Sequence, residues 1–95
     1  MVITILEARL DEKNWSDFQK DFAQRTADLP PQMVRTYLLQ DVKDRSLWQI
    51  VSVWKSREAL DEMRNSGETP TGVLMFRSAG AEPKLSIFNV PVFAP

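Results

Sequence analysis

Few side chains of this sequence could do chemistry, and most of them fall within predicted strands. Trp54 stands just before a helix start, where its indole could stack on a flat aromatic molecule or donate its N–H to an oxygen. Tyr37 is the only tyrosine, and Arg35 lies on the same face of its strand. A guanidinium favours the ionised form of a nearby phenol, so Tyr37 could take or give a proton. The alternatives are structural: Trp54 in the core, Tyr37 as a surface ring and Arg35 as an edge-strand charge.

Polar residues interrupt otherwise apolar strands at Thr4, Gln49, Ser52 and Asn89. Buried polar groups need hydrogen-bond partners, so each of these side chains either is satisfied by neighbours or points into a wet pocket. Asn89 is the most attractive candidate, because an amide could hold a substrate hydroxyl and carbonyl together or orient dioxygen beside an electron-rich carbon. These residue types indicate a hydrogen-bonding site for a small organic molecule.

Histidine and cysteine are both absent from the 95 residues. The chain therefore has no disulfide, no thiolate nucleophile, no Cys/His zinc site, no haem held by His and no Ser-His-Asp triad. The carboxylates alternate with basic residues or flank a turn, as in solvated faces, so we expect no hard metal site.

The charge balance excludes two classes of partner. Twelve Lys and Arg against 13 Asp and Glu give a formal net charge of −1, without the basic excess that nucleic acid or an acidic membrane surface would require. The first residues, MVITILEARLDE, are too short and too charged for a signal peptide, and no 18-residue apolar run exists. We expect a cytoplasmic protein with a single domain over residues 1–95.

The elements that must position these side chains follow from hydropathy and capping residues. Strands are predicted over residues 2–10, 33–41, 47–54 and 85–90. Amphipathic helices are predicted over about four turns from Asn14 until Pro30, from the N-cap Ser56 to near Asn65, and from Pro70, in the first helical position, to Gly80. The second and third helices count as one broken helical segment, so this order predicts an α+β, ferredoxin-like βαββαβ fold. Its four-stranded antiparallel sheet should carry both helical segments on one face.

Both faces of the predicted sheet carry large apolar side chains. In the third strand Trp48, Ile50 and Trp54 point one way, and Leu47, Val51 and Val53 point the other. Two helical segments cover only one face, so the apolar uncovered face is a predicted partner surface. We expect a homodimer that forms through this face.

The segment DRSLWQIVSVWKSREALDEM, residues 44–63, resembles the antibiotic biosynthesis monooxygenase-like domains of the dimeric α+β barrel superfamily. Members typically show a strand that ends in Trp and then a Ser-Arg-Glu-Ala helix start, which Trp54 and Ser56-Arg57-Glu58-Ala59-Leu60 match. The order of elements matches over nearly the whole chain. The resemblance implies two protomers with sheets packed face to face, each with a cleft between its sheet and its helices.

Two departures from the family pattern bear on chemistry. Relatives often carry a His where this chain has Met63 and another a turn later, where it has Glu68. Haem-degrading members use a Trp where Met63 stands, so the resemblance does not extend to haem degradation. Within the implied cleft we assign Tyr37, Asn89 and Trp54 to catalysis. The substrate-binding set is Arg35, Ser52, Thr4 and Met63.

The leading hypothesis is a cofactor-independent monooxygenase for a small flat aromatic substrate of the phenol, anthrone or hydroquinone type. Tyr37 or a bound water would have to act as the base, since no His exists. Two alternatives stay open: a non-catalytic homodimer that binds a metabolite in the same cleft, and a structural module whose cleft is filled by its own side chains. The residues available to fill it are Met33, Met63, Met75 and Phe76.

Overall fold

The strands follow the apolar segments of the sequence in the computed structural model, which describes residues 1–95. They are β1 (Val2–Arg9), β2 (Met33–Gln40), β3 (Leu47–Trp54) and β4 (Lys84–Asn89). All pairs are antiparallel, and the strand order is β2-β3-β1-β4. The predicted α+β ferredoxin-like fold is confirmed, with each predicted strand within one residue at either end.

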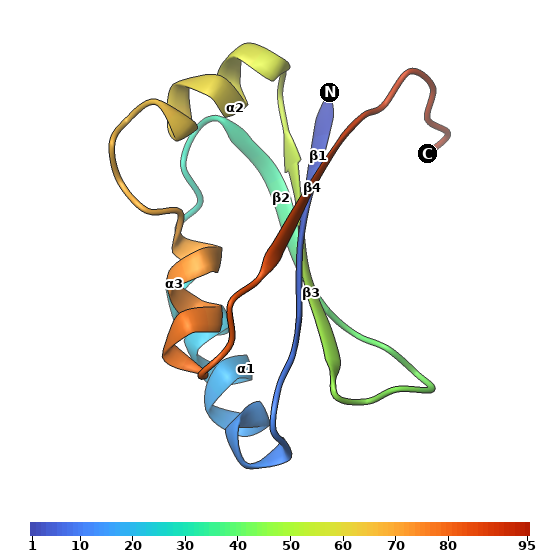
Figure 1. Cartoon of the computed structure of the whole chain (residues 1–95). Helices are drawn as coiled ribbons and strands as arrows, with labels where there is room; N and C mark the ends of the chain where they lie inside the picture. Colours follow the sequence, from blue (N-terminus) through green and yellow to red (C-terminus); the bar gives the residue numbers. More distant parts are fainter.

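The helical elements are η1 (Glu12–Asn14), a single 3-10 turn, and the α-helices α1 (Trp15–Arg25), α2 (Arg57–Arg64) and α3 (Thr71–Ser78). All of them lie on one face of the sheet, and no element covers the opposite face (Figure 1). The chain leaves β4 as an irregular tail that points away from the helices. None of the helices has the length and apolar character needed to cross a bilayer.

Helix α1 is shorter than predicted, since it ends at Arg25 rather than near Leu29. Leu29 precedes Pro30, and a residue before proline is disfavoured in the α region. Thr26 already leaves helical geometry, at φ −101° and ψ 9°, and its hydroxyl donates to the Phe22 carbonyl at 2.6 Å. Asn14 precedes the helix but makes no capping hydrogen bond with its side chain, because its amide donates to the Ala79 carbonyl instead. Pro70 is the N-cap of α3 rather than its first residue.

Ser56 caps α2 as predicted. Its Oγ accepts a hydrogen bond from the Ala59 amide at 3.0 Å, which satisfies one of the free donors of the first turn.

Replacing Ser56 by Ala should therefore lower the free energy of unfolding by about 1 kcal/mol, as measured by urea denaturation. Ser78→Ala is the matched control, since the exposed Ser78 hydroxyl at the end of α3 makes no hydrogen bond within the protein. Equal losses in the two variants would show that the cap contributes nothing.

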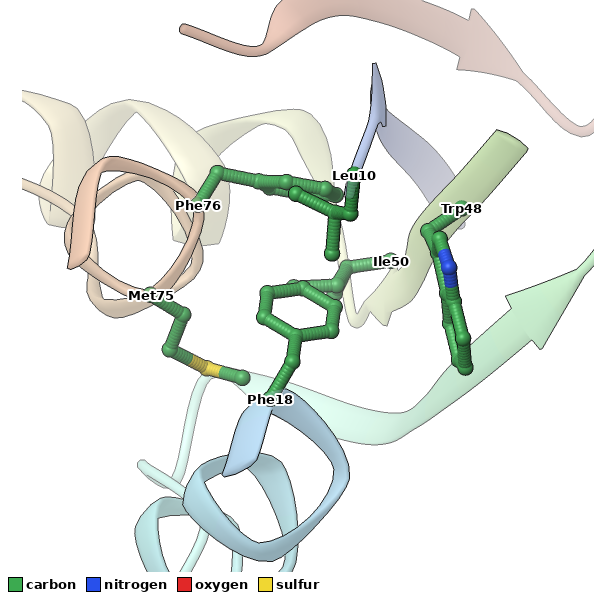
Figure 2. Close-up of a cluster of buried hydrophobic side chains, with 6 residues drawn as sticks. All are labelled: Leu10, Phe18, Trp48, Ile50, Met75 and Phe76. Carbon is green, nitrogen blue, oxygen red and sulfur yellow. The ribbon is translucent and has the colours of Figure 1, made fainter. Parts of the chain in front are cut away.

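Two separate apolar clusters pack between the sheet and the helices. The larger one, drawn in Figure 2, is formed by Leu10, Phe18, Trp48, Ile50, Met75 and Phe76. Phe18 lies at its centre, with ring centroids 4.9 Å from Phe76 and 5.8 Å from Trp48. The smaller cluster contains Val2, Trp54 and Leu60, with Met33, Met63 and Ile87 packed against it. Both clusters lie on the helix side of the sheet.

Candidate functional site

A row of hydroxyl side chains separates the two clusters. Along β3 the helix-facing residues are Trp48, Ile50, Ser52 and Trp54, so Ser52 interrupts an otherwise apolar series. Ser52 lies directly opposite Thr4 of β1 on one side and Thr36 of β2 on the other. Directly opposite residues share a face of the sheet. We call Thr36, Ser52 and Thr4 the hydroxyl row.

The hydroxyl row forms the floor of a cleft of about 640 Å³. This volume falls within the range of small-molecule sites. The end of α1, helices α2 and α3 and the loops between them form its walls, and the exposed loop Gly67–Pro70 borders it. The cleft that the family resemblance implied is therefore present, and the methionines and Phe76 do not fill it: Met75 and Phe76 belong to the larger cluster, while Met33 and Met63 line the wall.

The N-terminal turn of α3 packs closely against the cleft floor at Gly72. A Cβ at this position would lie 2.7 Å from Cδ1 of Leu6 and 3.5 Å from Cδ1 of Ile50. Glycine thus allows the helix backbone to approach β1 and β3 at the edge of the cleft. A larger residue here would require the end of the Leu6 side chain to move at the edge of the cleft.

Two members of the hydroxyl row are buried, and Thr36 is hydrogen-bonded to Ser52. Thr4 and Ser52 expose only 8% and 7% of their surface. The Oγ1 of Thr36 lies 3.0 Å from the Oγ of Ser52 and donates to the Val51 carbonyl at 3.2 Å. Along β3 the row is flanked by the apolar side chains of Ile50 and Trp54, whereas Thr26, Thr69 and Thr71 add hydroxyl groups elsewhere in the cleft lining.

Trp54 does not offer its N–H to the cleft, as one reading of the sequence expected. Its Nε1 donates to the Oγ1 of Thr4 at 2.9 Å, and both residues are buried. The indole is therefore committed to the hydroxyl row, and its ring packs with Val2 and Leu60. Any polar effect of Trp54 on a ligand must pass through Thr4.

The remaining predicted site residues do not join the cleft. Arg35 and Tyr37 flank Thr36 in β2, and because side chains alternate along a strand they lie on the opposite, uncovered face. There Nη1 of Arg35 donates to the Tyr37 hydroxyl at 3.2 Å, and this hydrogen bond raises the pKa of Arg35. Asn89 pairs with Val2 at the end of β4, but it is exposed and does not line the cleft. The structure thus brings Thr4, Ser52, Trp54 and Met63 together and separates them from Tyr37, Arg35 and Asn89.

Sequence reasoning missed Thr36 and the charged rim. Every threonine of the chain lines the cleft: Thr4, Thr26, Thr36, Thr69 and Thr71. Three of these five threonines, Thr26, Thr69 and Thr71, occur close to the ends of helices, which was the signal available in the sequence.

The rim carries Arg25, Arg64, Arg77, Asp28, Glu68 and Glu82. Arg25 is paired with Asp21 and Arg77 with Glu82, whereas Arg64 forms no ion pair.

Arg77 and Glu82 join α3 to the segment before β4 at this rim. Nε and Nη2 of Arg77 donate to the two carboxylate oxygens of Glu82, both at 2.8 Å. These hydrogen bonds lower the pKa of Glu82 and raise that of Arg77. A carboxyl whose pKa is lower in the folded chain stabilises it above the ordinary carboxyl pKa and loses that effect as the pH falls.

Glu82→Gln should therefore lower the melting temperature more at pH 7 than in acid, because the stabilisation from the lowered Glu82 pKa is lost as the pH falls and Glu82 takes up a proton. Because the pair is exposed, the difference should be small and should shrink in high salt. Thermal unfolding followed by circular dichroism measures it, with the exposed, unpaired Glu58→Gln as control. A difference that is independent of pH would contradict the ion pair.

Several solved structures share this fold. SnoaB, a cofactor-independent oxygenase from Streptomyces nogalater, superposes with a TM-score of 0.75 at 18% identity, over 99% of this chain and 96% of that one. A heme-degrading protein from Mycobacterium tuberculosis gives 0.73 at 24% identity, over 99% and 94%. A variant of MhuD with two manganese protoporphyrin IX molecules per active site gives 0.71 at 19% identity, over 100% and 99%. No curated protein sequence matches the chain.

The sequence itself identifies the family. The profile described as "Antibiotic biosynthesis monooxygenase" matches residues 1–70, which run from β1 through α2 to the loop before α3 and include most of the cleft floor. The chain belongs to the antibiotic biosynthesis monooxygenase family.

Proposed function

We propose that the protein is a cofactor-independent monooxygenase whose cleft binds a small flat aromatic substrate of the phenol, anthrone or hydroquinone type. The observation that carries the proposal is the cleft of about 640 Å³, whose floor presents the buried hydroxyls of Thr4 and Ser52 between two apolar clusters and whose charged residues lie at the rim, in a member of a monooxygenase family. Its apolar walls suit an aromatic ring system, and the hydroxyl row suits an oxygen on that system.

Such a substrate supplies the electrons for its own oxidation. In an anthrone, the CH₂ carbon loses two hydrogens and gains one oxygen atom from O₂, and the second oxygen atom leaves with those hydrogens as water. Deprotonation of the substrate makes the reacting carbon electron-rich, so the protein has to accept a proton, stabilise the oxyanion and exclude water. No external reductant is required.

The cleft offers groups for these tasks. Thr4 and Ser52 stand at the oxygen-binding level, and Met63 contributes to the apolar wall. Tyr37 lies on the other face of the sheet and cannot be the base within its own protomer. The carboxylates of Asp28 and Glu68 at the rim, or a bound water, take that role in the proposed mechanism.

Haem, which some structural relatives degrade or bind, does not fit the residues present. Proteins hold haem iron through His, Cys or Tyr, with Met as a partner ligand. The chain has no His or Cys, and its only tyrosine, Tyr37, lies on the face away from the cleft. Met33 and Met63 could supply only the weak thioether. We therefore assign no step to haem.

Oxygen uptake with a panel of anthrones, naphthols and hydroquinones tests the proposal, with a protein-free blank because these compounds also autoxidise. Ser52→Leu, which places a larger apolar group on the cleft floor, should abolish the enzymatic rate. Ser78→Leu adds the same group at the end of α3, outside the cleft, and should leave the rate unchanged. Rates equal to the blank across the panel would contradict the proposal. Binding without turnover would instead support the non-catalytic alternative, which the lack of a histidine base favours.

We also propose a homodimer through the uncovered face of the sheet. This face carries Ile3, Ile5, Leu39, Leu47, Val51, Val53 and Phe88. Leu39 and Phe88 expose 43% and 53% of their surface, and an exposed apolar patch bordered by polar residues such as Glu7, Gln49 and Arg35 typically marks a protein interface. A second copy of the sheet is complementary to it, since a twofold axis brings the same apolar surface from both protomers together.

A further inference from the structure

The hydrogen bonds of the cleft floor leave one donor without a partner. The Thr4 oxygen accepts the indole N–H of Trp54, but the Thr4 hydroxyl donates to no group of the protein. A threonine hydroxyl is both a donor and an acceptor, and here the fold uses only the acceptor. Thr4 exposes 8% of its surface and lines the cleft, so its free proton is available to whatever occupies the cleft.

The same count of hydroxyl protons indicates that Ser52 is an acceptor for a bound molecule. Thr36 has a single hydroxyl proton, which goes to the Val51 carbonyl. The contact between Thr36 and Ser52 must then use the Ser52 proton, with Thr36 as acceptor. This leaves the Ser52 oxygen with free lone pairs. Because Thr4 and Ser52 are directly opposite in register, the floor presents a donor beside an acceptor.

We propose that Thr4 is the residue that donates a hydrogen bond to a carbonyl or oxyanion oxygen of the bound aromatic molecule, and that Trp54 is a positioning residue that acts through Thr4. The indole N–H fixes the Thr4 oxygen and polarises its O–H, which strengthens the free donor. Ser52 accepts from a hydroxyl next to that oxygen. This inference rests on the ligand class of the proposed function, although it does not require turnover.

The donor makes the cleft selective for an oxygen at one position. A flat aromatic molecule without that oxygen would desolvate the Thr4 hydroxyl and leave it unpaired, because this hydroxyl donates to no group of the protein. One unpaired neutral hydrogen-bonding group lowers affinity by about tenfold. Fluorenone and fluorene are a suitable pair of probes, since they have the same three-ring outline and differ in a carbonyl oxygen.

Fluorenone should bind the wild-type protein about tenfold more tightly than fluorene, and the carbonyl stretch of bound ¹³C-labelled fluorenone should shift to lower frequency. Thr4→Val, which keeps the shape of the side chain, should abolish both the preference and the shift, and Thr4→Ser should restore them. Trp54→Phe should reduce the shift without abolishing it, because the hydroxyl remains but is no longer polarised. Ser78→Ala is the control, since it removes a hydroxyl at the end of α3, outside the cleft, and should leave both the preference and the shift unchanged.

Equal affinities for the two probes, or no binding of fluorenone, would overturn the role of Thr4. A shift in Trp54→Phe as large as in the wild type would overturn the positioning role of Trp54. Fluorenone carries no oxidisable hydroxyl, so these results do not depend on catalysis. A shifted carbonyl in a protein that shows no oxygen uptake would support the inference while contradicting the proposed monooxygenase.

Discussion

Val51→Lys should dissociate the proposed dimer into monomers while leaving the fold of the protomer intact. Val51 lies in β3 between Ile5 of β1 and Tyr37 of β2, near the centre of the uncovered face. Its side chain points away from the helices, because its neighbours Ile50 and Ser52 face the cleft and the core. A lysine here would project into solvent in a monomer but would be buried between the sheets of a dimer.

The size of the effect follows from symmetry. A twofold interface would contain two such lysines, each unpaired, and the nearest carboxylate on this face, Glu7, already accepts a hydrogen bond from Gln49 at 2.7 Å. An uncompensated buried charge costs about 3–5 kcal/mol, so the dimer dissociation constant should rise at least about 10³-fold. Mutual repulsion of the two lysines adds to this loss.

Sedimentation equilibrium over a range of protein concentrations measures the change. Ala23→Lys is the matched control, since it adds the same charge at an exposed position of α1, on the opposite side of the molecule. The control should remain dimeric with the wild-type dissociation constant. A wild-type protein that sediments as a monomer at 100 μM would disprove the proposed dimer, and a dimeric Val51→Lys variant would place its interface elsewhere.

The sequence predicted the strands and the capped start of α2 well because local physics decides them. Val, Ile and Trp at alternating positions define β3, and Ser56 has the side chain that the first turn of α2 needs. The end of α1 was less predictable, because the hydropathy period continues to Leu29 whereas the backbone leaves the helix at Thr26. The spacing of apolar residues does not reveal that Pro30 disfavours helical backbone geometry at the preceding residue, Leu29.

The site was predictable only where one strand face was clearly apolar. In β2 the two faces are similarly mixed: Thr36 and Leu38 on one side, Arg35, Tyr37 and Leu39 on the other. The sequence shows that Arg35 and Tyr37 share a face but not which face meets the helices. An irregularity between Met33 and Arg35 breaks the alternation there as well, so that Met33 and Thr36 both line the cleft. The Trp54–Thr4 hydrogen bond joins β3 to β1 and depends on a register that no local pattern specifies.

Trp54→Ala should be the most destabilising single substitution in the smaller cluster. Trp54 is buried against Val2 and Leu60, and its removal would leave a cavity that opens toward the cleft. Truncation of a buried aromatic residue to alanine lowers the free energy of unfolding by about 3–5 kcal/mol. The hydroxyl of Thr4 would also lose its donor, which leaves a buried polar atom unsatisfied on that side.

Comparison of Trp54→Phe with Trp48→Phe separates the hydrogen bond from the packing. Both tryptophans are buried, at 7% and 3% exposure, but the indole nitrogen of Trp48 has no hydrogen-bond partner. Both variants lose a similar volume, whereas only Trp54→Phe breaks a hydrogen bond, so we expect it to cost about 1 kcal/mol more in urea denaturation. In a double-mutant cycle with Thr4→Val this difference should appear as coupling to Trp54 and not to Trp48. Equal coupling to the two residues would mean that Trp54 stabilises the cleft floor by packing alone, and that the Thr4 hydroxyl needs no indole to hold it in place.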